Sequence, residues 1–393
     1  MGLKATIGSA FARALTSDAL RDARRRRAER KRRRQGGVAR VHFFHDPDDP
    51  YSQLAAQLLQ PLAARYRIVL DTHPVTAPAD AAVPDRPRLR DWARRDAAQL
   101  AARLGLAWPP SPSHAPGGAA DGDALRTRLG HYLGGTFFFE GEWYWGVDRL
   151  HFLEERLRAA GLCVAPGEPL VAPVVDVACP PVPAGLRHPD LHFFLSFRSP
   201  YTYLAVPRVR RLAAHYGARL HLRFVLPMVM RGLPVPRDKR LYIVRDAKRE
   251  ADRLGMRFGN IADPVGKPAE RGLAVLHRAI AAGKGEPFAE SFLQGVFADG
   301  IDAGSRRGLE QIAARAGLDA AFVASALADQ SWRAVAETNR HELLSLGLWG
   351  VPSFRVDDRP AQWGQDRLWA VERDLQAATG HPADHYVTSP AGD

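Results

Sequence analysis

The chain has 393 residues, which is too long for one small domain and suits two. A hydrophobic share of 46% and a charged share of 25% are ordinary for a globular protein, and the absence of any apolar run of about 18 residues excludes a membrane-spanning helix. The net charge of +12 lies almost wholly in residues 1–40, which hold 13 Lys or Arg against three acidic residues.

Residues 1–37 are predicted to form a basic tail. Residues 7–34 fit an Arg-rich amphipathic helix that Gly36 and Gly37 would end. The composition favours a solvated, partly disordered segment. The alternative is contact with anionic lipid or with nucleic acid phosphates. The basic cluster follows the apolar stretch instead of preceding it, so the N-terminus does not resemble a secretory signal and a cytoplasmic location is expected.

An internal repeat is the most informative feature of the sequence. Residues 42–55 and 192–205 are identical at seven of 14 positions, at a constant offset of 150. A second block, residues 145–150, recurs at residues 363–368. The two blocks stand in the same order in each half, which indicates a duplication.

Each half predicts the same elements in the same order. A strand leads into a helix that starts with Pro-Tyr, and a second strand follows, which predicts a parallel pair with a right-handed crossover. A hairpin and a last helix close each half. The ranges are 41–44, 68–72, 136–145 and 147–160 in the first half, and 191–197, 220–225, 353–363 and 365–379 in the second.

The halves differ between the second strand and the hairpin. The first half has a helix near residues 88–104 and a Pro/Gly-rich loop at 108–118. The second half holds a helical insertion with helices expected at 238–254, 269–282, 288–297, 306–316 and 331–346. The predicted segments are a basic tail (1–37), a reduced domain (38–164), a Pro-rich linker (165–189) and a second domain (190–393) with its insertion at about 227–346.

Residues 199–202, Ser-Pro-Tyr-Thr, follow a strand and begin a helix. A helix start carries about half a positive charge and favours a thiolate. Neither Ser199 nor Thr202 is a cysteine, so dithiol exchange is excluded, but a hydroxyl can donate a hydrogen bond to a thiolate from elsewhere and lower its pKa. The simpler alternative is that Ser199 is only a helix cap. Cys163 and Cys179 lie too far apart for a CxxC motif, so neither a disulfide framework nor a metal site is expected.

Three motifs, residues 199–205, 350–354 and 363–368, together resemble the 2-hydroxychromene-2-carboxylate isomerases. These enzymes belong with the kappa-class glutathione transferases in the DsbA-like branch of the thioredoxin superfamily. The resemblance covers the second half. It implies an α/β fold of two thioredoxin-like (DsbA-like) domains, of which the second has a large helical insertion and the first is reduced.

The resemblance also implies a glutathione site. Ser199 would sit beside the glutathione sulfur. Val351, which precedes a cis Pro352, would pair its backbone with the cysteinyl part. Gln365 and Asp366 would contact the γ-glutamyl group; the alternative for Asp366 is that an acidic residue simply suits the first turn of a helix. In such isomerases the thiolate adds to a conjugated double bond, the ring opens, a bond rotates and the thiol leaves, so that glutathione is a cofactor for a small conjugated aromatic acid.

The sequence departs from this family at residues 228–236, which lack the family's asparagine. Arg231 takes the place of the family's basic residue, and Arg231, Tyr242 and Asp246 are candidates for the substrate side. The alternative for the helix that carries Tyr242 and Asp246 is a solvated face.

The first half lacks the parts of this site. Asp49 stands where Ser199 does, and residues 134–136, Gly-Gly-Thr, replace Val-Pro-Ser. We expect this half to be a degenerate partner that packs on the second, and the oligomeric state stays open. Two alternatives to a glutathione-dependent isomerase or transferase remain: a DsbA-like thiol-disulfide oxidoreductase family member without dithiol activity, and a non-catalytic binding or scaffold protein.

Overall fold

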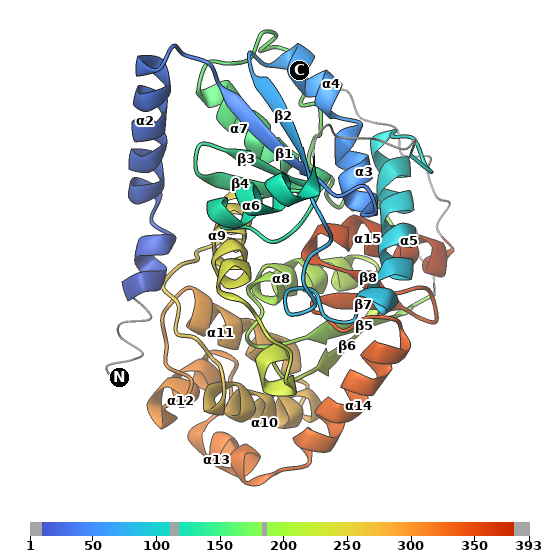
Figure 1. The fold of residues 1–393 in the computed structure, drawn as a ribbon. Coiled ribbons are helices and arrows are strands. Elements are labelled where there is room, and N and C mark those ends of the chain that lie inside the picture. Colours follow the sequence, from blue (N-terminus) through green and yellow to red (C-terminus); the bar gives the residue numbers. More distant parts are fainter. Residues whose placement is uncertain (1–9, 111–117, 183–186, 381–393) are drawn as a thin grey trace. The chain divides into compact units, whose positions relative to one another are not determined.

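The computed structural model describes residues 10–110, 118–182 and 187–380, and the chain divides into two compact units (Figure 1). The N-terminal unit contains Arg13–Val175 and Gly232–Arg249. The C-terminal unit contains Asp176–Arg231 and the described chain from Glu250 onward. Each unit is built around its own four-stranded sheet, so the expected α/β fold class is confirmed.

The two sheets have the same topology. The N-terminal sheet has the order β2-β1-β3-β4 and the C-terminal sheet the order β6-β5-β7-β8. In each, the first two strands are parallel and the hairpin is antiparallel. The strands are β1 (Arg40–His45), β2 (Val69–Pro74), β3 (Thr136–Phe139), β4 (Glu142–Trp145), β5 (Asp190–Leu195), β6 (Arg219–Phe224), β7 (Ser353–Val356) and β8 (Gln362–Trp363).

The registers of the two sheets correspond residue by residue. Phe44 pairs with Thr136 in the first sheet, and Phe194 pairs with Ser353 in the second. The residue just before the hairpin's first strand also corresponds, because the Gly135 carbonyl accepts from the Gly146 N–H at 2.8 Å and the Pro352 carbonyl from the Gly364 N–H at 2.9 Å. Gly135 therefore occupies the position of Pro352.

The N-terminal unit adds helices before, between and after its strands. They are α2 (Asp18–Arg34), α3 (Pro50–Ala56), α4 (Leu59–Arg65), α5 (Arg86–Leu104), α6 (Ala119–Leu129), the short η1 (Val147–Arg149) and α7 (Leu150–Ala159). Helix α6 was not anticipated, because its two glycine- and alanine-rich turns carry no apolar stripe.

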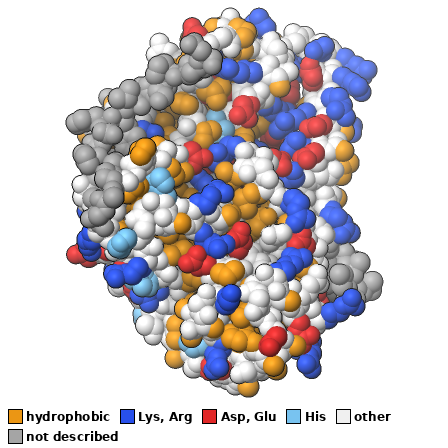
Figure 2. Space-filling view, turned by 180° about the vertical axis from the view of Figure 1, so that it is seen from behind, with side chains coloured by type: hydrophobic (Ala, Val, Ile, Leu, Met, Phe, Trp, Pro, Cys, Tyr) orange, Lys and Arg blue, Asp and Glu red, His pale blue; other side chains and the backbone are white. Residues whose placement is uncertain are grey.

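Helix α2 differs from the expected disordered tail. It starts at the Ser17 cap and buries none of its residues, so it is not amphipathic. Ion pairs hold it instead: Arg25 contacts Glu142 at 2.7 Å and Arg32 contacts Glu140 at 2.8 Å. Figure 2 shows basic side chains gathered along the right-hand side of the view, with acidic side chains between them.

The C-terminal unit carries most of the helical insertion. Its helical elements are α8 (Pro200–His215), η2 (Met228–Arg231), the last residues of α9 (Arg237–Arg253), α10 (Lys267–Ala281), α11 (Gly285–Phe297), α12 (Arg306–Arg315), α13 (Ala320–Ala328), α14 (Trp332–Ser345), η3 (Gln365–Arg367) and α15 (Leu368–Thr379). The sequence missed α13, a short alanine-rich helix. Residues 232–249, expected within the insertion of the second domain, belong instead to the N-terminal unit.

Aromatic packing fixes the insertion to the turn that precedes α8. Phe197, which follows β5, stacks on Phe292 of α11 with ring centroids 4.0 Å apart. Gly272 of α10 lies so close that an added Cβ would come within 2.4 Å of the Phe292 ring. Burying each phenylalanine contributes about 1.5–3 kcal/mol, so this contact orients the α8 start.

Two buried glutamates bind the backbone of the Pro-rich segment 165–189. The Glu154 carboxylate of α7 accepts from the N–H groups of Val171 and Ala172, at 2.8 and 2.9 Å. The Glu372 carboxylate of α15 accepts from Ala178 and Cys179, at 2.7 and 2.6 Å. The boundary between the units falls between these two anchors. Among the described residues, no helix has both the length and the apolar character to cross a membrane.

Candidate active site

Ser199 lies at the start of α8 with its hydroxyl directed at the loop before β7. Its Oγ accepts from the Thr202 N–H at 3.1 Å, which makes Ser199 the cap of the helix. The same Oγ donates to the Val351 carbonyl at 3.3 Å. Ser199 is half-buried, so the hydroxyl is within reach of a ligand. Ser199 can therefore cap α8 and still contact a ligand through the same hydroxyl.

The loop that faces Ser199 is held from two sides. The Val351–Pro352 peptide bond is cis, as the thioredoxin-like frame predicts. The Pro352 carbonyl is bonded to the backbone of Gly364. Gly350 cannot carry a side chain, because an added Cβ would lie 2.0 Å from the Trp363 ring. Ser199, Val351 and Pro352 are thus brought together as the sequence predicts.

Arg231 lies beside the same loop. Its guanidinium Nη2 donates to the Trp349 carbonyl at 3.1 Å, two residues before Val351. Burial lowers the pKa of Arg231 to about 10, and the nearby Arg340 contributes to the same shift. Its Nε is buried and has no hydrogen-bond partner among the described residues. The site therefore contains a poorly neutralised cation, which favours an anionic ligand.

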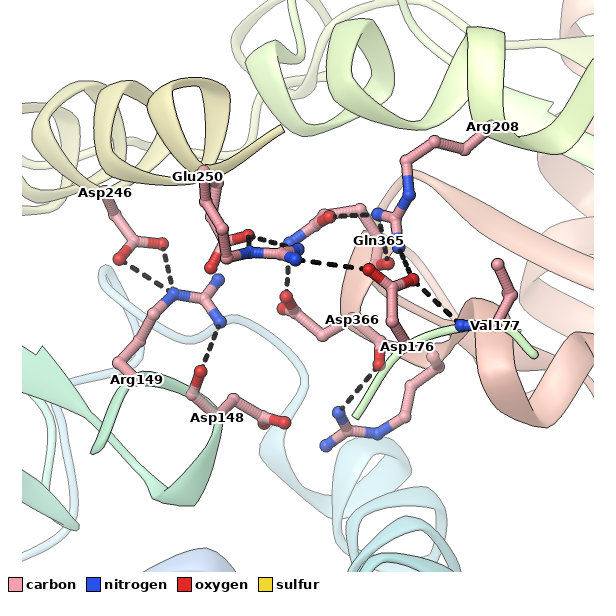
Figure 3. Close-up of polar contacts among 11 residues, drawn as sticks. Asp148, Arg149, Asp176, Val177, Arg208, Asp246, Glu250, Gln365 and Asp366 are labelled. Carbon is pink, nitrogen blue, oxygen red and sulfur yellow. Dashed lines mark hydrogen bonds and ion pairs between the residues drawn. The ribbon is translucent and has the colours of Figure 1, made fainter. Parts of the chain in front are cut away.

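Gln365 and Asp366 belong to a hydrogen-bonded chain (Figure 3). The buried Gln365 side chain accepts from Arg208 Nη1 at 2.6 Å, and Arg208 Nη2 donates to Asp176 at 2.7 Å. The Gln365 amide in turn donates to the Asp366 carboxylate. Asp366 is half-buried, so Asp366 is the member of this pair that a ligand can contact, whereas Gln365 acts through it.

Two members of that chain were missed by sequence reasoning. Burial alone would raise the pKa of Asp176, but Arg208 and Arg253 hold it below its ordinary value. Asp176 lies in the segment interpreted as a linker, and Arg208 lies on the buried face of α8. A charged residue at a buried helix position is the signal that could have identified Arg208.

Tyr242 and Asp246, the other two substrate-side candidates, belong to the N-terminal unit. Asp246 is 1% exposed and accepts from Arg149 Nε with both oxygens at 2.9 Å (Figure 3). The Tyr242 ring packs in an apolar cluster with Phe44 and Trp143. These side chains hold this part of α9 in the N-terminal unit, whereas Ser199 belongs to the C-terminal unit.

The N-terminal unit has no room for an equivalent loop. Asp49 caps α3 through the Ser52 N–H at 3.1 Å, as Ser199 caps α8. Burial, with a contribution from Asp46, raises the pKa of Asp49 to about 7. Gly135 has a φ of +63°, which proline cannot adopt, and an added Cβ on Gly134 would lie 2.4 Å from the Asp46 side chain. Valine and proline therefore do not fit at these two positions.

Comparison with known proteins identifies the C-terminal part of the chain. Residues 190–376 match the DSBA-like thioredoxin domain family. These residues form a DsbA-like thioredoxin domain. No curated protein is similar enough in sequence to match.

Solved structures similar to this chain include a probable DsbA oxidoreductase from Streptomyces coelicolor (21% identity, TM-score 0.40, 51% of this chain and 94% of that chain). A 2-hydroxychromene-2-carboxylate isomerase has 22% identity and a TM-score of 0.42 over 50% of this chain and 100% of its own. The cytosolic disulfide reductase DsbM from Pseudomonas aeruginosa, in its structure with GSH, has 20% identity and a TM-score of 0.37 over 48% and 96%.

The DsbA-like domain has hydroxyls where a dithiol enzyme would carry its two cysteines. Ser199 is accessible, whereas Thr202 is fully buried and its Oγ1 has no hydrogen-bond partner among the described residues. Because neither Ser199 nor Thr202 is a cysteine, the domain cannot form a disulfide of its own at this position.

Proposed function

We propose that the DsbA-like domain is a glutathione-dependent isomerase of the 2-hydroxychromene-2-carboxylate type, or a related glutathione transferase, that acts on a small conjugated aromatic acid. One observation carries the proposal: the Ser199 Oγ, at a helix start, lies 3.3 Å from the carbonyl of the residue before the cis proline. A helix start favours a thiolate, but this chain has no cysteine there, so the thiolate would come from a bound molecule.

The residues present fit glutathione at both ends. Bound glutathione would supply a thiolate that adds to a conjugated double bond and leaves again. Ser199 would turn its hydrogen from the Val351 carbonyl to the sulfur, and a hydrogen bond to the charged form lowers the thiol pKa. Asp366 would accept from the γ-glutamyl ammonium group, and the buried Gln365 would position Asp366.

Glutathione binding is tested by the melting temperature of the full-length protein. Because a ligand that binds only the folded state stabilises it by mass action, glutathione should raise Tm, and S-methylglutathione, which has no thiolate, should raise it less. Asp366→Ala should reduce the shift, whereas Asp49→Ala should leave it unchanged. No shift at any millimolar concentration of glutathione would contradict the proposal and favour the binding or scaffold function.

Turnover separates a catalytic Ser199 from a helix cap. With glutathione and a conjugated aromatic acid, Ser199→Ala should lower kcat/KM by about 10²–10³, as loss of one preorganised donor does. Ser199→Asn retains a capping side chain but removes the hydroxyl, and should lose as much activity with less loss of stability. Activity that follows stability in both variants would overturn the role of the hydroxyl.

We also infer that the two halves are copies, of which the first has lost its site. Tyr66 donates to Glu154 at 2.9 Å, and Tyr216 donates to Glu372 at 3.0 Å. The tyrosines keep the offset of 150, and the glutamates the offset of 218 that relates Trp145 to Trp363. Each glutamate also binds two successive backbone N–H groups, which favours duplication over chance similarity.

A further inference from the structure

The N-terminal sheet brings three metal-ligating side chains to one place. His42 of β1 lies opposite Asp71 of β2 in the parallel register, and His73 is two residues further along β2. Residues two apart on a strand point to the same face of the sheet. The His42 Nδ1 lies 2.9 Å from the His73 Nε2 and 3.6 Å from an Asp71 oxygen. One ligand atom from each residue lies within 4.8 Å of the other two.

These separations suit a small divalent ion. Zinc bonds of about 2.0–2.1 Å place tetrahedral ligand atoms roughly 3.3 Å apart, and the observed 2.9 and 3.6 Å lie on either side of that value. We propose that His42, Asp71 and His73 bind one divalent transition-metal ion of the zinc type. All three residues are half-buried, so an ion can enter and water can complete its coordination.

The donor set selects the class of metal. Two imidazoles and one carboxylate suit zinc or ferrous iron, whereas magnesium and calcium prefer oxygen ligands alone. Arg40 competes for the site, because its Nη1 donates to both Asp71 oxygens at 2.6 and 2.7 Å. The Arg40 side chain is 51% exposed, and an ion pair this exposed contributes little to stability. Asp71 can therefore turn one oxygen to a metal and keep the other for Arg40.

The C-terminal sheet provides an internal control. His192, His221 and Arg223 occupy the register positions of His42, Asp71 and His73. Arg223 Nε donates to the His192 Nδ1 at 3.2 Å. A guanidinium has no lone pair to offer a metal, so these three register positions hold at most two metal ligands. The proposed metal site therefore uses residues of the N-terminal unit alone, and it is independent of the proposed function.

Zinc titration of the tag-free, full-length protein tests the site. Isothermal titration calorimetry should show one zinc ion per chain, and Co²⁺ should give the visible absorption of a protein-bound ion that zinc displaces. His73→Ala and Asp71→Asn should each weaken zinc binding by about 100-fold or more. Loss of a residue that only supports a metal ligand already weakens binding about 10- to 100-fold, and loss of a ligand should cost more. His192→Ala in the C-terminal sheet is the matched control and should leave the affinity unchanged.

Two results would overturn the metal site. One is the absence of saturable zinc binding by the unchanged protein. The other is an equal loss of affinity in His73→Ala and His192→Ala, which would assign binding to scattered surface histidines. Metal-free circular dichroism of each variant, with unchanged spectra and melting, excludes misfolding as the cause of a lost site. If His73→Ala does not fold, the zinc affinity of Asp71→Asn serves as the test, because asparagine has the same shape as aspartate.

Discussion

At the scale of single residues, the two halves differ at the position that caps the helix after the first strand. Ser199 and Asp49 both cap the helix that follows the first strand. The serine hydroxyl carries a hydrogen, which it donates to the Val351 carbonyl, whereas the Asp49 carboxyl has no hydrogen to donate once ionised. Because burial raises the pKa of Asp49 to about 7, ionisation of Asp49 destabilises the folded protein.

Asp49→Asn should therefore stabilise the protein at alkaline pH. The folded pKa is raised, so the unfolded chain releases the Asp49 proton first, and stability falls as pH rises from the unfolded value of 3.8 to about 7. Asparagine keeps the cap but does not titrate. We expect the variant to gain about 1–2 kcal/mol at about pH 8 and nothing at about pH 4, measured by urea unfolding. Equal effects at both pH values would exclude titration of Asp49 as the cause.

At the scale of elements, a buried glutamate on the last helix of each half binds the backbone of the Pro-rich segment 165–189. Glu154 on α7 is fully buried and accepts from two backbone N–H groups and the Tyr66 hydroxyl. Hydrogen bonds to a charged group contribute about 1.5–3 kcal/mol each, and removing the acceptor leaves buried donors unsatisfied.

Glu154→Ala should destabilise the N-terminal unit by about 2–4 kcal/mol, because two backbone donors lose their acceptor. The neighbouring Glu155 is exposed on the same helix, and Glu155→Ala is the matched control, with an expected change within about 0.5 kcal/mol. Urea unfolding followed by tryptophan fluorescence measures both. Similar midpoints for the two variants would show that the carboxylate anchor is dispensable.

At the scale of the whole molecule, the chain passes between the two units more than once. Residues 232–249 come from within the second domain's sequence but belong to the N-terminal unit. The buried Arg149–Asp246 pair and the Tyr242 ring fix this segment there. The two units are therefore not separable by a single cut in the sequence.

Asp246→Ala should release the first part of α9 from the N-terminal unit. Removing one partner of a buried ion pair costs about 3–5 kcal/mol, because the buried Arg149 loses the carboxylate that accepts from its Nε. Limited proteolysis should then cleave within residues 232–249, which are protected in the unchanged protein. Asp252→Ala, at an exposed position of the same helix, is the control. Equal cleavage of both variants would refute this anchor.

Much of the fold was predictable because its signals are local. The strand patterns, the Pro-Tyr helix starts and the two repeated blocks each lie within a few residues, and the structure has the sheets and helices they predict. The helices α6 and α13 were missed, because neither has an apolar stripe at helical spacing. The facing of Ser199 and Val351 was expected from the resemblance to a thioredoxin-like frame, in which the loop before the proline lies against the helix start.

The sequence by itself determined that the chain has two α/β halves, that the second lacks cysteines at its helix start, and that Asp49 replaces Ser199 in the first. Only the tertiary structure decided that Gln365 is buried against Arg208, that Tyr242 and Asp246 belong to the N-terminal unit, and that His42 meets His73. The physical reason is range: secondary structure follows neighbouring side chains, whereas burial and charge pairing depend on which distant segments the fold brings together.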